Sequence, residues 1–455
     1  MVQFDEKMYG TSKAKLESIF DAGTFVELGA YTKRQDSATD FEGVLCGYGA
    51  VSGKLAFAFV QDSGRTKGAF GERHAKKIAN MYALAVKNGA PVIGVFDSAG
   101  AVVYDGAAAL AAYGKFMKCV SDASGIIPQI AVIDGVCAGS SAVVASMFDF
   151  TVTIKDKSKL YVNSPFVLGD KIGTSDFAAA SGISAYNAKD ASDAFAFAKK
   201  LVAALPANNA DGAFAENSDD MNRAVDFDAE NYKAEELVAT LADSASFIPV
   251  YADYCENTLL GIATFGGMTA GVVASQGVLD IKSARAITKL ESFCDSFSMP
   301  LVTLVDSEGL DVSLEAEGAA YASELARLAY AYTASDNAKL TVVVGKAYGA
   351  AFTLLGSKAV GADMELALPT ACISVLSPEA SVAFVWNSKV GEQSREELEK
   401  EWKEKCASAA EACDAGEIDD IVAPEELRAR ICAALAMLAS KAEGTPSRRH
   451  ANMPL

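Results

Sequence analysis

The residues of this chain that could do chemistry belong to two loops of small amino acids, one in each half of the sequence. The first reads C-A-G-S-S (137–141) and follows the apolar run 128–136, and the second reads A-Y-G-A-A (347–351) and follows the apolar run 340–346. Each run stops at a turn where a helix could begin, and such a turn exposes backbone N–H groups that can hold an oxyanion or a phosphate. The sequence therefore predicts two oxyanion holes for two substrates.

The two loops are parts of a longer internal repeat. A D-S-x-G motif precedes each loop, and 209 positions separate Asp97 from Asp306. The separation between Gly139 and Gly349 is 210 positions. A drift of one residue over this distance is hard to obtain by chance, so the spacing indicates two related halves.

The elements that must position these loops also occur twice. Two β-runs around a glycine turn predict a hairpin at 47–62 and again at 264–276. A helix with regular apolar spacing follows each hairpin, at 71–91 and at 280–300, and ends at a proline before the D-S-x-G strand. Each half therefore predicts an α/β unit with crossover connections, in the order hairpin, helix, strand, loop, helix, strand, loop, helix.

We place two domains of roughly 200 residues each at 1–235 and 236–455, because the repeat period favours two units over the three that length alone suggests. The stretch 165–235 is rich in Ala, Asn and Asp and lacks a strong β pattern, which predicts a helix followed by a polar linker. After about residue 380 the β pattern fades, and the sequence predicts charged C-terminal helices.

The composition limits the classes of protein that remain. A net charge of −19 and a pI near 4.7 argue against a nucleic-acid partner, which requires a basic surface. The nine cysteines are odd in number and lack C-x-x-C spacing, so we expect free thiols in a reducing compartment and no metal site. No signal peptide opens the chain and no apolar stretch is long enough to span a bilayer, which predicts a soluble, cytoplasmic protein.

Five segments resemble one protein family over nearly the whole chain. The segment G-A-P-V-I-G-V-F-D-S-A-G-A (89–101) is similar to G-A-P-V-I-G-L-N-D-S-G-G-A, and G-K-A-Y-G-A-A-F (345–352) resembles K-A-Y-G-G-A-Y. D-G-V-C-A-G-S-S-A-V (134–143) is similar to G-x-C-A-G-G-A, and the closing segments 416–431 and 447–455 resemble I-D-D-I-I-x-P and R-K-H-x-N-I-P-L. These are motifs of the carboxyltransferase family of biotin-dependent enzymes. The family includes the β subunits of propionyl-CoA and related acyl-CoA carboxylases, methylmalonyl-CoA transcarboxylase, and the α subunits of biotin-dependent decarboxylases.

The resemblance implies two tandem crotonase-like (ClpP/crotonase) domains that arose by internal duplication, the first on the acyl-CoA side and the second on the biotin side. It implies transfer of a carboxyl group between carboxybiotin and the α-carbon of a short acyl-CoA of the propionyl or methylmalonyl type. It also implies a ring-shaped homohexamer, in which the N-terminal domain of one subunit and the C-terminal domain of its neighbour share an active site. The implied partners are a biotin carboxyl carrier protein and either a biotin carboxylase or a membrane decarboxylase subunit, which could bring the protein to a membrane. Because the chain lacks an A-M-K-M attachment motif, biotin would arrive on a partner.

The resemblance also assigns the site residues. The backbone donors of the two holes, and thus the catalytic residues, would be Gly139, Ser140, Ala350 and Ala351. The substrate-binding residues would be Gly100, Ala101, Gly309, Gly349, Thr353, Arg65 and Lys67. The two basic residues could meet the phosphates of coenzyme A or belong to a solvated loop, and the threonine occupies the family's acyl-selectivity position. For a single loop of this kind, small residues that only permit tight strand-to-helix packing are the alternative.

Several positions depart from the family pattern. The arginine that follows S-G-G-A is Val102 here, and the glycines of three motifs are replaced by Ala99, Ser140 and Ala350. A backbone N–H survives a change from Gly to Ala or Ser if φ stays negative, so the predicted oxyanion chemistry is retained. The alternative function is a crotonase-fold subunit that binds acyl-CoA as a scaffold without transferring a carboxyl group.

Overall fold

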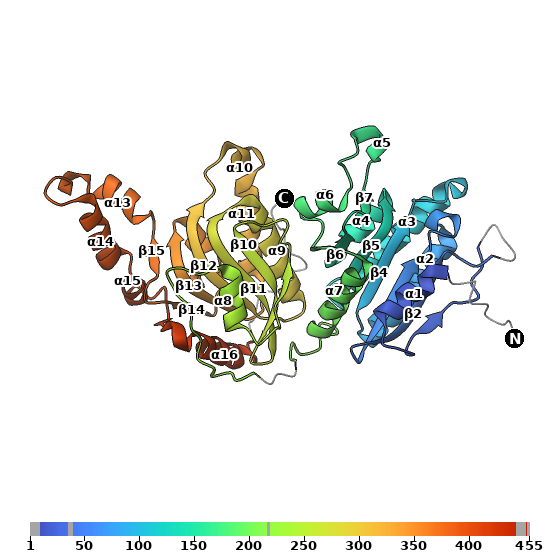
Figure 1. Ribbon diagram of the computed structural model, residues 1–455, viewed down its shortest axis with the longest axis horizontal. Helices are drawn as coiled ribbons and strands as arrows, with labels where there is room; N and C mark the ends of the chain where they lie inside the picture. Colours follow the sequence, from blue (N-terminus) through green and yellow to red (C-terminus); the bar gives the residue numbers. More distant parts are fainter. Residues whose placement is uncertain (1–9, 35–39, 216–218, 443–451, 453–455) are drawn as a thin grey trace. The chain divides into compact units, whose positions relative to one another are not determined.

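The computed structural model describes residues 10–34, 40–215, 219–442 and 452. The closing segment 447–455, on which part of the resemblance rests, lies outside these residues except for Asn452. The chain forms two compact units, Met1–Gly212 and Ala213–Leu455. Each unit is an α/β body built around an eight-stranded sheet (Figure 1).

In the first unit the strands lie in the order β1-β2-β3-β4-β5-β6-β8, and β7 pairs with the end of β5. The strands are β1 (Val26–Leu28), β2 (Val44–Val51), β3 (Lys54–Gln61), β4 (Val92–Ser98), β5 (Gln129–Ala138), β6 (Phe150–Ile154), β7 (Lys159–Tyr161) and β8 (Tyr186–Ala188). The helices are α1 (Gly10–Ile19), α2 (Glu72–Asn88), α3 (Ala107–Ala123), α4 (Ser140–Ser146), α5 (Pro165–Leu168), α6 (Ser175–Ala180) and α7 (Ala191–Ala204). β1 to β3 are antiparallel and the strands from β3 onward are parallel, so α2 and α3 serve as crossover helices that pack on each other.

The second unit repeats this order as β9-β10-β11-β12-β13-β14-β16, and β15 pairs with the end of β13. Its strands are β9 (Ile248–Val250), β10 (Thr258–Phe265), β11 (Met268–Leu279), β12 (Leu301–Leu310), β13 (Lys339–Tyr348), β14 (Met364–Ala367), β15 (Cys372–Ser374) and β16 (Asp420–Ile421). Its helices are α8 (Ala234–Leu241), α9 (Ile281–Ser296), α10 (Leu314–Gly318), α11 (Tyr321–Ala334), α12 (Ala350–Leu354), α13 (Pro378–Val385), α14 (Arg395–Cys406), α15 (Ala409–Asp414) and α16 (Leu427–Leu438). The two matching sheets confirm the predicted α/β fold and fit an internal duplication.

The central strands are apolar on both faces, as expected for parallel strands that helices cover on both sides. In β4 and β12 nearly every side chain is buried. Both predicted hairpins are present, with two-residue turns between β2 and β3 and between β10 and β11. The central residues of both turns have positive φ, the conformation that matches the twist of the flanking strands.

The region between the two repeats differs from its prediction. Besides the expected helix (α7), the stretch 165–235 contains α5, α6 and the strand β8, which pairs in parallel with β6. The units divide at Gly212/Ala213, before the 235/236 border taken from the sequence. Residues 213–235 belong to the second unit because they bond to its sheet: Phe214 forms a bridge with Met268, and the Tyr232 hydroxyl donates to Asp306.

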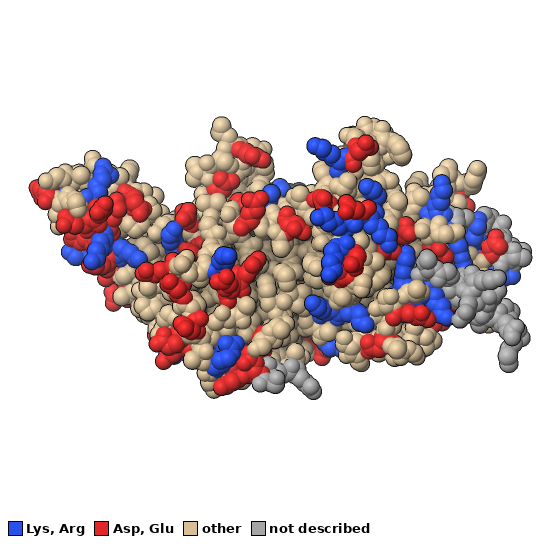
Figure 2. All heavy atoms as spheres, in the orientation of Figure 1, with Lys and Arg blue, Asp and Glu red and all other residues tan. Residues whose placement is uncertain are grey.

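The net charge is unevenly distributed between the units. Residues 1–212 contain 21 Lys and Arg and 21 Asp and Glu, whereas residues 213–455 contain 19 and 38. The entire net charge of −19 therefore belongs to the second unit, where Figure 2 shows acidic side chains spread over the surface and mixed with basic ones at α14. All nine cysteines are free thiols. Among the described residues, no helix is long and apolar enough to cross a membrane, and no cluster of ligand side chains could hold a metal ion.

Candidate active site

An aspartate fixes the end of the sheet that carries the first loop. β4 and β5 pair in register up to Phe96 and Ile133, but the next pair is Ser98 and Cys137, so β5 carries a two-residue bulge. The Asp97 carboxylate accepts a hydrogen bond from the N–H of Val136 in this bulge, at 3.2 Å. Its second oxygen accepts one from the Ser63 hydroxyl at 2.5 Å.

The second unit builds the same feature. The register of β12 and β13 shifts between Val305 and Ser307, and Asp306 accepts a hydrogen bond from the N–H of Lys346 at 2.9 Å. Its second oxygen accepts one from the Tyr232 hydroxyl at 3.0 Å. A glycine faces the carboxylate in each unit, because a Cβ on Gly135 would lie 2.1 Å from Asp97 Oδ1 and a Cβ on Gly345 would lie 2.5 Å from Asp306 Oδ1. In the sequence both aspartates are recognisable only as markers of the repeat, and their structural role was missed.

The glycine in the turn after each bulge has a protein acceptor for its N–H group. Gly139 has φ 60° and Gly349 has φ 59°, a region that L-residues rarely adopt. Their N–H groups donate to the carbonyl oxygens of Tyr161 and Ser374, both at 2.9 Å. These two N–H groups are therefore already engaged in this structure, and the catalytic role of Gly139 stays a prediction.

The free donors are the next N–H groups along each loop. The first N–H groups of a helix have no intrahelical acceptor. In the described part of the chain, the N–H groups of Ser140, Ala350 and Ala351 bond to no other group. Ser140 is half-buried, Ala350 is exposed and the side chain of Ala351 is buried, so the two loops present backbone rather than long side chains.

The D-S-x-G turns lie beside these loops, because they end the neighbouring strands β4 and β12. Gly100 and Gly309 share the same backbone angle, with φ 117°, and their N–H groups donate to the hydroxyls of Ser98 at 3.2 Å and Ser307 at 3.4 Å. Ala101 pairs with Phe70 in a short parallel bridge. The structure thus brings the predicted glycines and alanines of each unit to one end of its sheet.

The basic pair Arg65 and Lys67 lies against the first loop. The N–H of Ala99 donates to the Lys67 carbonyl oxygen at 3.0 Å, which holds this segment beside the turn. Arg65 forms an ion pair with Asp62 at 3.4 Å, whereas the exposed Lys67 ammonium bonds to no described residue. Lys67 therefore remains the better candidate of the two for a phosphate contact.

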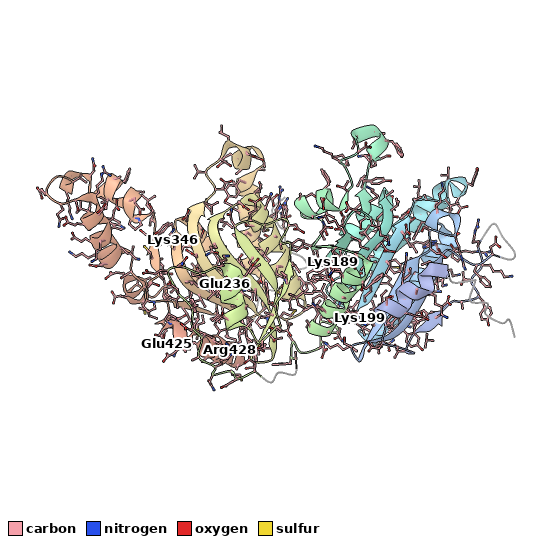
Figure 3. The ribbon with its side chains drawn as sticks, in the orientation of Figure 1. Lys189, Lys199, Glu236, Lys346, Glu425 and Arg428 are labelled. Carbon is pink, nitrogen blue, oxygen red and sulfur yellow. The ribbon has the colours of Figure 1, made fainter. Side chains whose placement is uncertain are left out.

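At the second loop, Lys346 forms an ion pair with Glu308 at 2.7 Å, and both side chains are about half exposed. This hydrogen bond raises the pKa of Lys346 and keeps the ammonium charged. Thr353 lies on α12 with its side chain exposed. Figure 3 shows the buried Arg428 of α16 at the lower edge of the second unit, below Lys346, so the ion pairs of Arg428 with Asp243 and Asp219 stabilise the fold away from the loop.

A buried tyrosine supports the first loop and was missed by sequence reasoning. Tyr113 of α3 is 3% exposed, and its hydroxyl lies 2.8 Å from the Ser141 hydroxyl in the first turn of α4. Its ring stacks on Phe70 at 4.3 Å between centroids. Burial raises the pKa of Tyr113, so it stays protonated and acts as a support. Cys137 is fully buried, and burial raises the pKa of its thiol, as expected for a core residue rather than a nucleophile.

A cavity of about 540 Å³ opens beside the first D-S-x-G turn. Its lining includes Ala101, Val102 and Tyr104, the arginines Arg34 and Arg73, and the carboxylates of Glu42, Glu72 and Asp105. Val102, which stands where the related motif has an arginine, thus contributes an apolar wall, while two arginines from other segments line the same cavity.

Comparison with known proteins agrees with this geometry. The carboxyl transferase domain family matches residues 10–453. The chain is 32% identical to the propionyl-CoA carboxylase beta chain of Saccharopolyspora erythraea over 495 residues, covering 98% of this chain and 90% of that protein. It is also 32% identical to the methylmalonyl-CoA decarboxylase subunit alpha of Veillonella parvula over 476 residues, covering 98% and 93%. The crystal structure of transcarboxylase 12S, a hexamer with methylmalonyl-coenzyme A and methylmalonic acid bound, superposes with a TM-score of 0.92 at 29% identity and covers 99% of this chain and 94% of its own. The chain belongs to the carboxyl transferase family.

Proposed function

We propose that this protein is the carboxyltransferase subunit of a biotin-dependent acyl-CoA carboxylase or decarboxylase, with a short acyl-CoA of the propionyl or methylmalonyl type as substrate. The observation that carries the proposal is the pair of matching loops. In each unit an aspartate fixes a strand bulge, and the turn after it leaves backbone N–H groups that have no acceptor among the described residues. Relatives of the whole chain are propionyl-CoA carboxylase and methylmalonyl-CoA decarboxylase subunits.

The reaction needs two anion-binding sites. Carboxyl transfer to the α-carbon of a thioester places negative charge on the thioester oxygen, and the carboxyl donor places charge on a second oxygen. Fixed N–H donors in a water-poor site stabilise such charge, by about 3–4 kcal/mol for one donor. We assign the Ser140 N–H, with Ala101 nearby, to the thioester oxygen, and the Ala350 and Ala351 N–H groups to the second oxygen.

Biotin would supply the carboxyl group and arrive on a biotin carboxyl carrier protein. The residues at the second loop fit its ureido oxygen, because two neighbouring N–H groups bond to no described residue there. A biotin carboxylase or a membrane decarboxylase subunit would load or unload that carrier. The side chains at this loop are small, which leaves room for a bulky group to approach the backbone.

We propose a homohexamer as the working assembly. Each unit exposes large apolar side chains in the segments that follow its loop-bearing strands, including α5 and α10 (Figure 1). The most exposed of these residues are Val103, Tyr104, Phe166 and Val167 in the first unit and Val312, Leu314, Val375 and Phe384 in the second. Clustered apolar side chains of this kind mark interaction surfaces, and the structurally similar transcarboxylase 12S is a hexamer.

The direct test is decarboxylation of malonyl-CoA or methylmalonyl-CoA in the presence of free biotin, followed by chromatography of the CoA esters. We expect slow turnover that depends on biotin. Binding of CoA esters without turnover of either ester, at any pH from 6 to 9, would contradict the proposal and favour a scaffold. Light scattering tests the assembly, and a stable monomer at micromolar concentration would refute the hexamer.

A further inference from the structure

A second cavity of the first unit lies on the outer face of α2. It has a volume of about 460 Å³, and α2 lines it with residues spaced at about one helical turn, Arg73, Lys76, Lys77, Asn80, Met81 and Leu84. The opposite wall is the end of β1 and the segment after it, with Leu28, Gly29, Thr32 and Lys33. We call this cavity the α2 groove.

The lining of the α2 groove has one sign of charge. It contains four basic residues and no carboxylate, although the first unit as a whole contains equal numbers of basic and acidic residues. The Lys77 side chain is 5% exposed, and its ammonium donates to the Val44 carbonyl oxygen at 2.8 Å and to Glu27 at 3.2 Å. Lys77 therefore holds the wall together, whereas the exposed Lys76 bonds to no described group.

Arg73 joins the α2 groove to the cavity beside the first loop. It lines both cavities, and one of its terminal nitrogens donates to the carbonyl oxygens of Lys33 at 2.9 Å and Arg34 at 3.1 Å. These bonds orient the guanidinium across the boundary. Arg73 thus connects the cavity that contains Ala101, whose lining has both acidic and basic residues, to the α2 groove, whose charged residues are all basic.

We propose that the α2 groove binds the phosphorylated nucleotide end of a ligand, with Arg73 and Lys76 contacting its phosphates. The inference rests on the proposed function: the pantetheine arm of a coenzyme A thioester would occupy the cavity beside Ala101, and the nucleotide would reach the groove. A phosphate monoester carries about −1.5 to −2 charges at neutral pH, which suits a groove whose charged lining residues are all basic. Arg73 offers a planar fork for phosphate oxygens, and Lys76 offers a point charge. The apolar side chains of Leu28, Met81 and Leu84 provide a surface for the base.

Binding is tested by calorimetric titration of the full-length protein with coenzyme A, adenosine 3′,5′-bisphosphate and ATP. We expect coenzyme A and adenosine 3′,5′-bisphosphate to bind. Arg73→Ala and Lys76→Ala should each weaken the affinity for both compounds by about tenfold, and this loss of affinity should be smaller at high salt. Lys87→Ala is the matched control, because Lys87 is exposed on the same helix and does not line the groove. Failure of the wild-type protein to bind either compound would overturn the proposal.

Kinetics separate the groove from the reaction. We expect Lys76→Ala to raise KM for malonyl-CoA about tenfold at unchanged kcat, and to leave the kinetics of malonyl-pantetheine unchanged. An equal rise in KM for both esters would overturn the proposal, since pantetheine lacks the nucleotide. ATP binding that Lys76→Ala weakens, with unchanged kinetics for malonyl-CoA, would keep the nucleotide site and assign it to free nucleotides. If the wild-type protein turns over neither ester, the proposed function fails, whereas the titrations still decide whether the groove binds nucleotides.

Discussion

Replacing single loop residues with proline separates backbone catalysis from side-chain catalysis. Ser140 and Ala350 are the first residues of α4 and α12, a position at which proline is well tolerated because the N–H has no helical acceptor. The glycine before each has φ near 60° and ψ of −124° or −145°. This conformation is close to the mirror image of the extended backbone that precedes proline, and glycine adopts either hand without strain. Ser140→Pro and Ala350→Pro should therefore fold.

The expected loss of activity follows from the donor that each variant removes. Loss of one donor from an oxyanion site costs about 2.7–4 kcal/mol, which corresponds to a fall in kcat of roughly 10²–10³-fold. Either variant alone should show the whole effect, because one reaction uses both loops. Gly139→Pro would be a poor test, since it would break the N–H bond to Tyr161 and force a residue with φ 60° to a negative angle.

The assay is biotin-dependent decarboxylation of malonyl-CoA, with circular dichroism and light scattering to establish that each variant folds and assembles. Ser140→Ala and Ala350→Ser are the matched controls, because they change the side chain and keep the N–H, and they should lose at most about threefold. A folded, assembled Ser140→Pro protein with the activity of Ser140→Ala would refute the assignment of that N–H to an oxyanion.

Three further predictions concern the fold that supports the loops. Gly345→Ala should lower both Tm and activity, because its Cβ would lie 2.5 Å from Asp306 Oδ1. Gly114→Ala is the control in the middle of α3, where a Cβ meets no atom within 4 Å. In thermal unfolding it should raise the free energy of unfolding by about 0.5–1 kcal/mol. Burial raises the pKa of Glu365 from 4.5 to about 8, so the folded protein binds the extra proton and its stability should fall as pH rises from about 4.5 to 8; Glu365→Gln should flatten this part of the curve of Tm against pH. Cys137→Ala should keep kcat within about tenfold. Because the thiol is fully buried, iodoacetamide should leave it unmodified in the native protein, as mass spectrometry of the peptide that contains Cys137 would show.

The repeat made most of the fold predictable. Apolar β-runs around a glycine turn, and helices that end at a proline before D-S-x-G, are local signals, and the structure has both hairpins and both crossover helices. The second hairpin begins at Thr258, well before its predicted start at residue 264. The strand β8 was missed because it is three residues long, Tyr186–Ala188, and its pairing with β6 depends on residues more than thirty positions earlier. The border between the units was placed late for a similar reason, since Tyr232 reaches Asp306 across 74 positions.

The site was predictable at the level of loops and less so at the level of atoms. Small residues after an apolar run indicate exposed N–H groups, but which groups are free depends on distant partners. The N–H of Gly139 is engaged by Tyr161 on β7, a strand that the sequence analysis did not predict. The contact of Tyr113 with Ser141 likewise joins two helices, and no spacing rule links these residues.

What the two units share, and what they do not, bears on the proposal that one fold binds two substrates. The aspartate, the bulge and the positive φ of the following glycine are the same in both, and these features set the positions of the N–H groups. The partner of each aspartate differs, Ser63 from the adjoining loop in one unit and Tyr232 from the inter-repeat segment in the other. The surroundings differ as well. The first loop belongs to a unit with equal numbers of acidic and basic residues and a basic groove, whereas the second loop belongs to a unit with an excess of 19 acidic residues. A duplicated backbone that presents the same donors can thus bind different anions, because specificity depends on the side chains around the loop while stabilisation of the oxyanion depends on the main chain.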